Sequence, residues 1–88
     1  MAQVIYSGRA LENLERAARV PEGLPAIESA VAHLAAHPLV GRRVEDDLRE
    51  LVISFGATGY IALYRFVVQR DEVRVLALRH QREIGYLP

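Results

Sequence analysis

The end of the chain carries side chains suited to proton transfer and charge stabilisation. His80, Arg82, Glu83 and Tyr86 bring an imidazole, a guanidinium, a carboxylate and a phenol together within seven residues. Cleavage of RNA at a 2′-hydroxyl needs such a set: a base takes the hydroxyl proton, a cation stabilises the phosphorane, and an acid protonates the leaving oxygen. In this scheme His80 is the base or the acid, Arg82 holds the charge, and Tyr86 is a stacking surface or the acid.

Two further arginines extend this candidate catalytic set, but a structural interpretation remains open. Arg65 and Arg79 lie at or near the ends of neighbouring predicted strands and supply additional cations. A histidine beside an arginine and a glutamate is also common as a surface hydrogen-bonding cluster. Ile84 and Tyr86 are equally suited to fixing the end of the chain.

Other polar clusters favour structural roles. His33 and His37 lie four residues apart on a predicted helix without nearby acidic residues, so a solvated helix face is favoured over a metal site. Arg42 and Arg43 precede the acidic residues 45–47, and we expect these loop charges to neutralise one another. The sequence therefore predicts no metal and no cofactor.

Length and composition predict one domain that spans residues 1–88. A chain of 88 residues with 51% hydrophobic content has enough apolar surface for a small core. The absence of cysteine excludes disulfide scaffolds, cysteine-based zinc sites and thiol nucleophiles. No apolar run approaches the roughly 20 residues that span a bilayer, and the first residues do not resemble a signal peptide. We expect a cytoplasmic protein without a membrane partner.

The charge of the chain is balanced but unevenly distributed. Eleven basic residues, all arginine, match eleven acidic residues, so lysine chemistry is excluded. Residues 1–52 contain six arginines and eight acids, whereas residues 53–88 contain five arginines and three acids. A net charge of zero argues against non-specific binding to nucleic acid, which usually needs a basic excess.

The first half of the chain predicts one strand and two helices. Residues 3–6 favour a strand, and Ser7 or Gly8 is suited to cap the helix predicted over 9–19. Prolines and glycine in residues 20–25 predict a turn. A second helix then runs from Pro25 to the residue before Pro38, and the two helices form a hairpin.

The second half predicts strands that position the candidate residues. Residues 39–47 are expected to be a polar connector, followed by strands over 48–54, 60–68 and 73–79. Short connections predict an antiparallel meander, and the apolar middle strand predicts a central position. The order β-α-α-β-β-β predicts a two-layer α+β fold, with the helical hairpin packed on one face of a mostly antiparallel sheet. The other face is then available for a partner.

The apolar stripes of the two helices are expected to belong mainly to the core. Leu11 and Leu14 lie on the first stripe, and Ile27, Val31 and Leu34 on the second. Any width of these stripes that the sheet leaves uncovered would form a groove for a partner helix.

Taken together, these segments resemble the RelE/ParE superfamily of bacterial toxins from type II toxin–antitoxin modules. The likeness runs from Tyr6-Ser7 and the helix around Ala10, through Leu48–Leu51, Gly59-Tyr60 and Tyr64-Arg65, to the closing segment Val75–Glu83. The order and spacing of these segments carry the resemblance. It implies a small toxin held inactive by a cognate antitoxin whose disordered segment folds around it. The groove residues Leu11, Leu14, Ile27 and Val31 are then candidates for antitoxin binding.

The resemblance implies two alternative targets. RelE-like members cleave mRNA on the ribosome, and ParE-like members poison DNA gyrase without nuclease activity. RelE-like nucleases have an arginine after the Gly-Tyr of the middle strand, where this chain has Ile61. They also use lysines on the preceding strand, where this chain has Arg49 and Glu50. Arg82 matches their C-terminal arginine, and His80 matches the histidine of some related nucleases.

The incomplete nuclease set and the neutral charge favour a ParE-like toxin that acts on DNA gyrase by protein–protein binding. The alternative is a RelE-like endoribonuclease with His80, Arg82, Tyr86 and Arg65 at its site, and with ribosome and mRNA as partners. A second alternative is a non-toxic remnant that only binds antitoxin.

Overall fold

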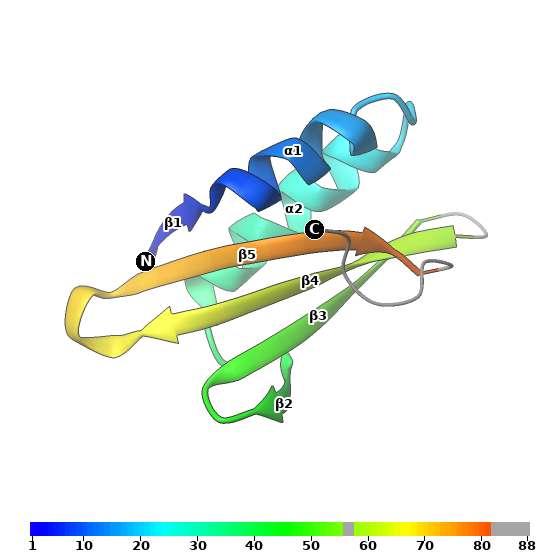
Figure 1. The fold of residues 1–88 in the computed structure, drawn as a ribbon. Helices are drawn as coiled ribbons and strands as arrows, with labels where there is room; N and C mark the ends of the chain where they lie inside the picture. Colours follow the sequence, from blue (N-terminus) through cyan, green and yellow to red (C-terminus); the bar gives the residue numbers. More distant parts are fainter. Residues whose placement is uncertain (56–57, 82–88) are drawn as a thin grey trace.

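The fold is a sheet with two helices on one of its faces (Figure 1). The computed structural model describes residues 1–55 and 58–81, with the side chains of Phe55 and Thr58 left out. Its elements in chain order are β1 (Gln3–Tyr6), α1 (Gly8–Ala17), α2 (Gly23–Ala36), β2 (Arg42–Glu45), β3 (Leu48–Phe55), β4 (Thr58–Val67), the 3₁₀ helix η1 (Val68–Arg70) and β5 (Glu72–His80). The predicted two-layer α+β fold is confirmed.

The strand order within the described residues is β1-β5-β4-β3-β2. β3, β4 and β5 pair in sequence as an antiparallel meander, and β4 lies in the centre of the sheet, as the sequence predicts. β1 pairs with β5 in the parallel direction at one edge of the sheet, and the two helices carry the chain from β1 to β2 at the other edge.

The prediction of a polar connector over residues 39–47 is wrong for residues 42–45. Residues Arg42–Glu45 form β2, an antiparallel edge strand whose side chains are all exposed. Its sequence, Arg-Arg-Val-Glu, lacks the alternation that identifies a half-buried strand, since neither of its faces is buried. Charged side chains on a short edge strand also discourage pairing with other chains.

Both helices begin within two residues of their predicted starts at residues 9 and 25. Ser7 caps α1 by accepting a hydrogen bond from the Ala10 amide at 3.0 Å. α2 begins at Gly23, so that Pro25 lies in its first turn, where no intrahelical donor is required. α2 ends at Ala36, before Pro38.

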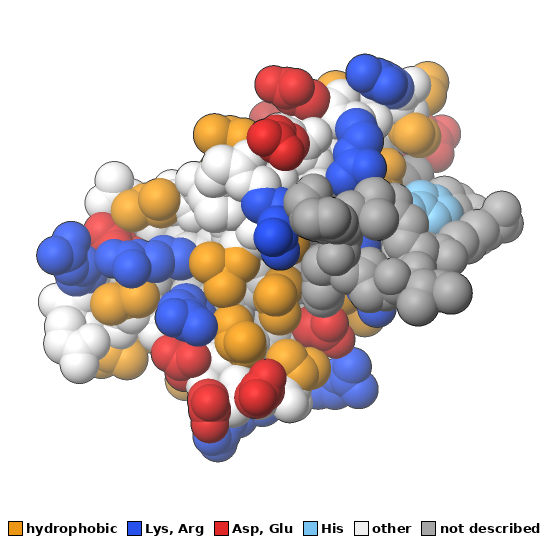
Figure 2. Space-filling view, viewed as in Figure 1, with side chains coloured by type: hydrophobic (Ala, Val, Ile, Leu, Met, Phe, Trp, Pro, Cys, Tyr) orange, Lys and Arg blue, Asp and Glu red, His pale blue; other side chains and the backbone are white. Residues whose placement is uncertain are grey.

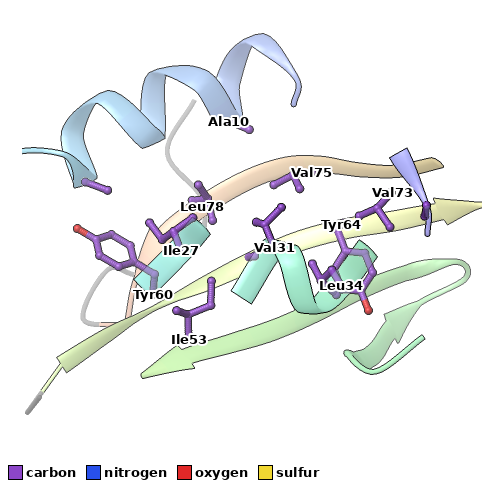
Figure 3. Packing of buried hydrophobic residues seen from close by; sticks show 13 residues of the cluster. Ala10, Ile27, Val31, Leu34, Ile53, Tyr60, Tyr64, Val73, Val75 and Leu78 are labelled. Carbon is purple, nitrogen blue, oxygen red and sulfur yellow. The ribbon is translucent and has the colours of Figure 1, made fainter. Parts of the chain in front are cut away.

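The core lies between the helices and the three central strands (Figure 3). Ile27 and Leu34 of α2 have no exposed surface, and Tyr64 of β4 is also fully buried. Burying an aliphatic side chain of this size contributes roughly 1.5–3 kcal/mol to the free energy of unfolding.

A β-bulge in β5 determines which way the end of this strand faces. Leu63 pairs with Ala77 and Tyr64 pairs with Val75, so Leu76 is the extra residue. The backbone groups released at the bulge bind side chains of the first helical segment. The Ser7 hydroxyl donates to the Leu76 carbonyl at 2.7 Å, and the buried Asn13 accepts from the Leu78 amide at 2.9 Å. These two contacts hold α1 on β5.

A second polar contact fixes the segment after α2 to the sheet. The buried Tyr64 hydroxyl donates to the Pro38 carbonyl and accepts from the Gly41 amide, both at 2.8 Å. A Cβ atom on Gly41 would lie 2.6 Å from the Tyr64 ring, so this close approach requires glycine.

Candidate interaction face of the sheet

The face of the sheet opposite the helices is the main candidate site. In an antiparallel pair, residues directly opposite each other share a face. The register therefore places the following residues on this open face: Leu48, Glu50 and Val52 of β3, Ile61, Leu63 and Arg65 of β4, and Arg74, Ala77 and Arg79 of β5. Figure 2 shows hydrophobic side chains gathered over the middle of the sheet, with charged side chains around them.

The centre of the open face is an apolar strip, which we define as Leu48, Val52, Ile61 and Leu63. Val52 is 59% exposed and lies on β3 beyond the residues that pair with β2, and the other three are partly exposed. A β-branched side chain that is this exposed gains little from burial within the monomer. The strip therefore offers apolar contact area to a partner.

Three of the arginines around the apolar strip have acidic partners. Arg42 pairs with Glu50 at 2.9 Å across the β2–β3 ladder, and Arg74 pairs with Glu72 at 3.2 Å. Arg65 lies 3.7 Å from Asp47. The predicted neutralisation of Arg42 within its own loop occurs instead with the neighbouring strand. These pairs leave the described part of the open face with a nearly balanced charge.

His80 and Arg65 are far apart. His80 pairs with Tyr60, and the rings of the two residues meet edge to face at 5.4 Å on the helix side of the sheet. Arg65 lies on the open face, five residues farther along β4, which corresponds to about 17 Å of strand. The C-terminal ends of neighbouring antiparallel strands lie at opposite ends of the sheet. Arg65 and His80, which lie near these two ends, therefore do not share a site.

The bulge at Leu76 explains the positions of Arg79 and His80. Without the extra residue, regular alternation from Val73 and Val75 would direct Arg79 toward the helices. With it, Arg79 lies opposite Ile61 on the open face, and His80 lies on the helix side. Two other members of the candidate catalytic set, Arg82 and Tyr86, lie outside the described residues.

Arg49 lies on the strand where the resemblance to RelE-like nucleases implies lysines, but its side chain faces away from the open face. It lies opposite the buried Tyr64, and its guanidinium donates to the carbonyls of Leu39 and Gly41 at 3.2 and 2.9 Å. Arg49 therefore orders the segment after α2. At the neighbouring open-face positions, Glu50 binds Arg42, and Ile61 is apolar.

The four candidate groove residues do not form one exposed surface. Ile27 is fully buried and Val31 is 7% exposed, so both belong to the core beneath the sheet. Leu14 is half-buried against this core, and Leu11 is 51% exposed. Of these four residues, a partner that binds the folded chain can contact Leu11 and the exposed part of the Leu14 side chain.

A second concavity lies at the end of the sheet near η1. It is a shallow depression of about 480 Å³ lined by Leu39, Phe66 and Val68 together with charged side chains of the β2–β3 hairpin. Two of these charged side chains, Arg43 and Arg49, donate to backbone carbonyls of the chain itself. Among the described residues, no group of three or more histidine, cysteine, aspartate or glutamate side chains is arranged to hold a metal. None of the helices in the described part is long and apolar enough to span a membrane.

The apolar strip was not predicted from the sequence as a unit. Val52, Ile61 and Leu63 lie in strands rich in apolar residues, where an open-face position is indistinguishable from a core position. The signal was the strand order: a central β4 flanked by β3 and β5, with helices available for only one face, leaves every second apolar residue uncovered.

Comparison with known proteins identifies relatives of this chain. Residues 4–85 match the family described as the ParE toxin of the type II toxin–antitoxin system parDE. The toxin RelE3 of Caulobacter vibrioides is 44% identical over 57 residues, which cover 65% of this chain and 60% of that protein.

Solved toxin–antitoxin structures share the fold. The RelBE2 complex of Mycobacterium tuberculosis contains a chain that is 28% identical, with a TM-score of 0.69, covering 91% of this chain and 98% of that one. The E. coli RelBE complex contains a chain with a TM-score of 0.74 and 14% identity, covering 94% of this chain and 100% of that one. At this low identity the second likeness shows the fold alone.

Proposed function

Since the chain belongs to the ParE toxin family of type II toxin–antitoxin systems, within the RelE/ParE superfamily, we propose that it is a toxin that poisons DNA gyrase by docking through the open face of its sheet. The observation that carries this proposal is the apolar strip surrounded by ion-paired arginines. Gyrase is the target that the resemblance implies for ParE-like members.

The charges of the open face support docking onto a protein rather than RNA. Binding to a nucleic-acid backbone depends on cations that can neutralise phosphates and release counterions. Here Arg42, Arg65 and Arg74 already face carboxylates. Protein interfaces, in contrast, have an apolar centre with a polar rim, as the strip and its surrounding ion pairs do.

A cognate antitoxin is the partner expected to hold the toxin inactive. Two of the structural relatives are toxin–antitoxin complexes, which supports such a partner for this chain. The antitoxin is proposed to cover part of the described surface while the toxin is inactive.

A supercoiling assay tests the gyrase proposal. Purified toxin added to gyrase and relaxed plasmid is expected to inhibit supercoiling or to trap cleaved DNA, and equimolar cognate antitoxin is expected to relieve the effect. Growth arrest when the gene is induced in cells would show that the protein is toxic. If the purified protein then leaves gyrase activity unchanged even in large excess, gyrase is removed as the target.

A second candidate function is ribosome-dependent mRNA cleavage. The names of the similar toxins, RelE3 and RelBE2, favour this RelE-like activity over gyrase inhibition. The proposed residues are His80, Arg82 and Tyr86, whereas the position of Arg65 separates it from His80.

Cleavage of a defined message in a purified translation system tests this alternative. Cuts at ribosome-bound codons, abolished by His80→Ala and by Arg82→Ala, would establish the nuclease. Growth arrest that persists in both variants would exclude their catalytic role.

A further inference from the structure

The last turn of α2 holds the two exposed histidines of the described chain. His33 and His37 are four residues apart, and the amide of His37, the C-cap residue, donates to the carbonyl of His33 at 2.9 Å. Both side chains are exposed, and their ring centroids lie 4.8 Å apart with a tilt of 46°. The rings are therefore neighbours that are not stacked face to face.

This separation matches the one that a shared metal ion requires. With metal–nitrogen bonds of about 2.0–2.1 Å and about 1.1 Å from nitrogen to ring centre, two imidazoles on one ion at 90–109° have centroids roughly 4.5–5.2 Å apart. The observed 4.8 Å lies within this range. At this separation both imidazoles can reach one ion when a nitrogen of each ring is turned toward it.

We propose that His33 and His37 form a surface site for one divalent transition-metal ion, with water completing the coordination. Two imidazole nitrogens select borderline ions such as Ni²⁺, Cu²⁺ and Zn²⁺, because Mg²⁺ and Ca²⁺ require oxygen ligands. The C-terminal end of α2 adds a favourable potential, since its free carbonyls carry partial negative charge.

The site is separate from the proposed gyrase-docking surface. α2 covers the helix side of the sheet, whereas the apolar strip lies on the opposite face. A bound ion would link the last turn of α2 to its C-cap residue and would stabilise the end of this helix against fraying.

Metal titration of the full chain without a histidine tag tests the proposal. Isothermal titration calorimetry with NiCl₂ and ZnCl₂ is expected to give one ion per chain, bound more tightly for Ni²⁺ or Cu²⁺ than for ions such as Mn²⁺. His33→Ala and His37→Ala should each weaken binding at least about tenfold, because even outer-shell partners are worth roughly 10–100-fold. The matched control is His80→Ala, which removes the third histidine of the chain and should leave the affinity unchanged.

The NMR signals of the imidazoles give an independent readout. Zn²⁺ should shift the ring resonances of His33 and His37 together and leave those of His80 in place. Absence of binding at millimolar Ni²⁺, or binding lost in His80→Ala but retained in His33→Ala and His37→Ala, would overturn the proposal.

Discussion

At the scale of single residues, a few buried polar groups hold the elements of this chain together. The Tyr64 hydroxyl bridges Pro38 and Gly41, and Asn13 accepts from the amide at Leu78. Each of these groups lies in the interior, where an unsatisfied hydrogen-bonding group costs much more than it does at the surface.

Replacement of Tyr64 by phenylalanine tests the bridge between the sheet and the segment after α2. The variant leaves the buried Gly41 amide without its acceptor, so the free energy of unfolding should fall by about 1–3 kcal/mol. Urea denaturation measures this loss. Tyr6→Phe is the matched control, because the described structure shows no hydrogen bond to the Tyr6 hydroxyl, and it should change the free energy of unfolding much less. Equal losses in both variants would contradict the role of the bridge.

The pH dependence of stability provides a second test at this scale. Burial raises the pKa of Tyr64 above its usual 10.0, against smaller lowering effects of the Gly41 hydrogen bond and the Arg49 charge. Burial and the charge of Glu28 likewise raise the pKa of Tyr6. A raised pKa means that the fold favours the neutral phenol, so this contribution is complete below the unfolded pKa of 10.0 and is lost as the pH rises above it.

Denaturation midpoints measured across this alkaline range should therefore fall as the pH rises. The fall should be smaller in Tyr64→Phe than in the parent protein, since one of the two phenols with a raised pKa is gone. A midpoint that is insensitive to alkaline pH would show that neither phenol resists ionisation in the fold.

At the scale of elements, the bulge in β5 and its contacts with α1 orient the end of the sheet. Asn13→Ala removes the acceptor of the buried Leu78 amide, and we expect a loss of about 1–3 kcal/mol in the free energy of unfolding. Glu12→Ala, at the exposed neighbouring position of the same helix, should change it by no more than about 0.5 kcal/mol. Similar urea midpoints for the two variants would exclude a stabilising contact between Asn13 and β5.

Local sequence predicted the elements whose periodicity is strong. Residues 3–6 and the three strands of the meander have β-branched and aromatic residues, and both helices have caps or prolines near their ends. β2 escaped prediction because its exposed charged sequence has no buried face. The bulge escaped prediction because Leu76 is an ordinary apolar residue, and the polar groups that satisfy it, Ser7 and Asn13, lie far away in the sequence.

The candidate catalytic set was the least predictable part, because its geometry depends on how distant segments of the chain pair. Arg65, Arg79 and His80 belong to adjacent strands, and proximity in the sequence pattern suggested a shared site. Antiparallel pairing separated Arg65 from His80 along the strands, and one extra residue in β5 placed Arg79 and His80 on opposite faces. The first effect follows from the antiparallel meander that the sequence predicts, whereas the bulge behind the second effect is not visible in residue types or spacing.

At the scale of the whole molecule, the two faces of the sheet have different roles. The helix side contains the core, and the open side combines an apolar strip with ion-paired arginines. This division explains how a small chain with no net charge can fold stably and still expose a surface for a partner. The central claim is that this partner is a protein that contacts the apolar strip.

Binding of purified toxin to gyrase, measured by surface plasmon resonance for three proteins, tests this claim most directly. Val52→Asp places a charge on the strip, where Val52 is 59% exposed, and should weaken binding at least about tenfold. Val68→Asp makes the same change at a 70% exposed position away from the strip and should bind like the parent protein. Circular dichroism of both variants controls for folding. Tight gyrase binding that Val52→Asp leaves intact would contradict the claim, as would a toxin that binds no gyrase but binds ribosomes.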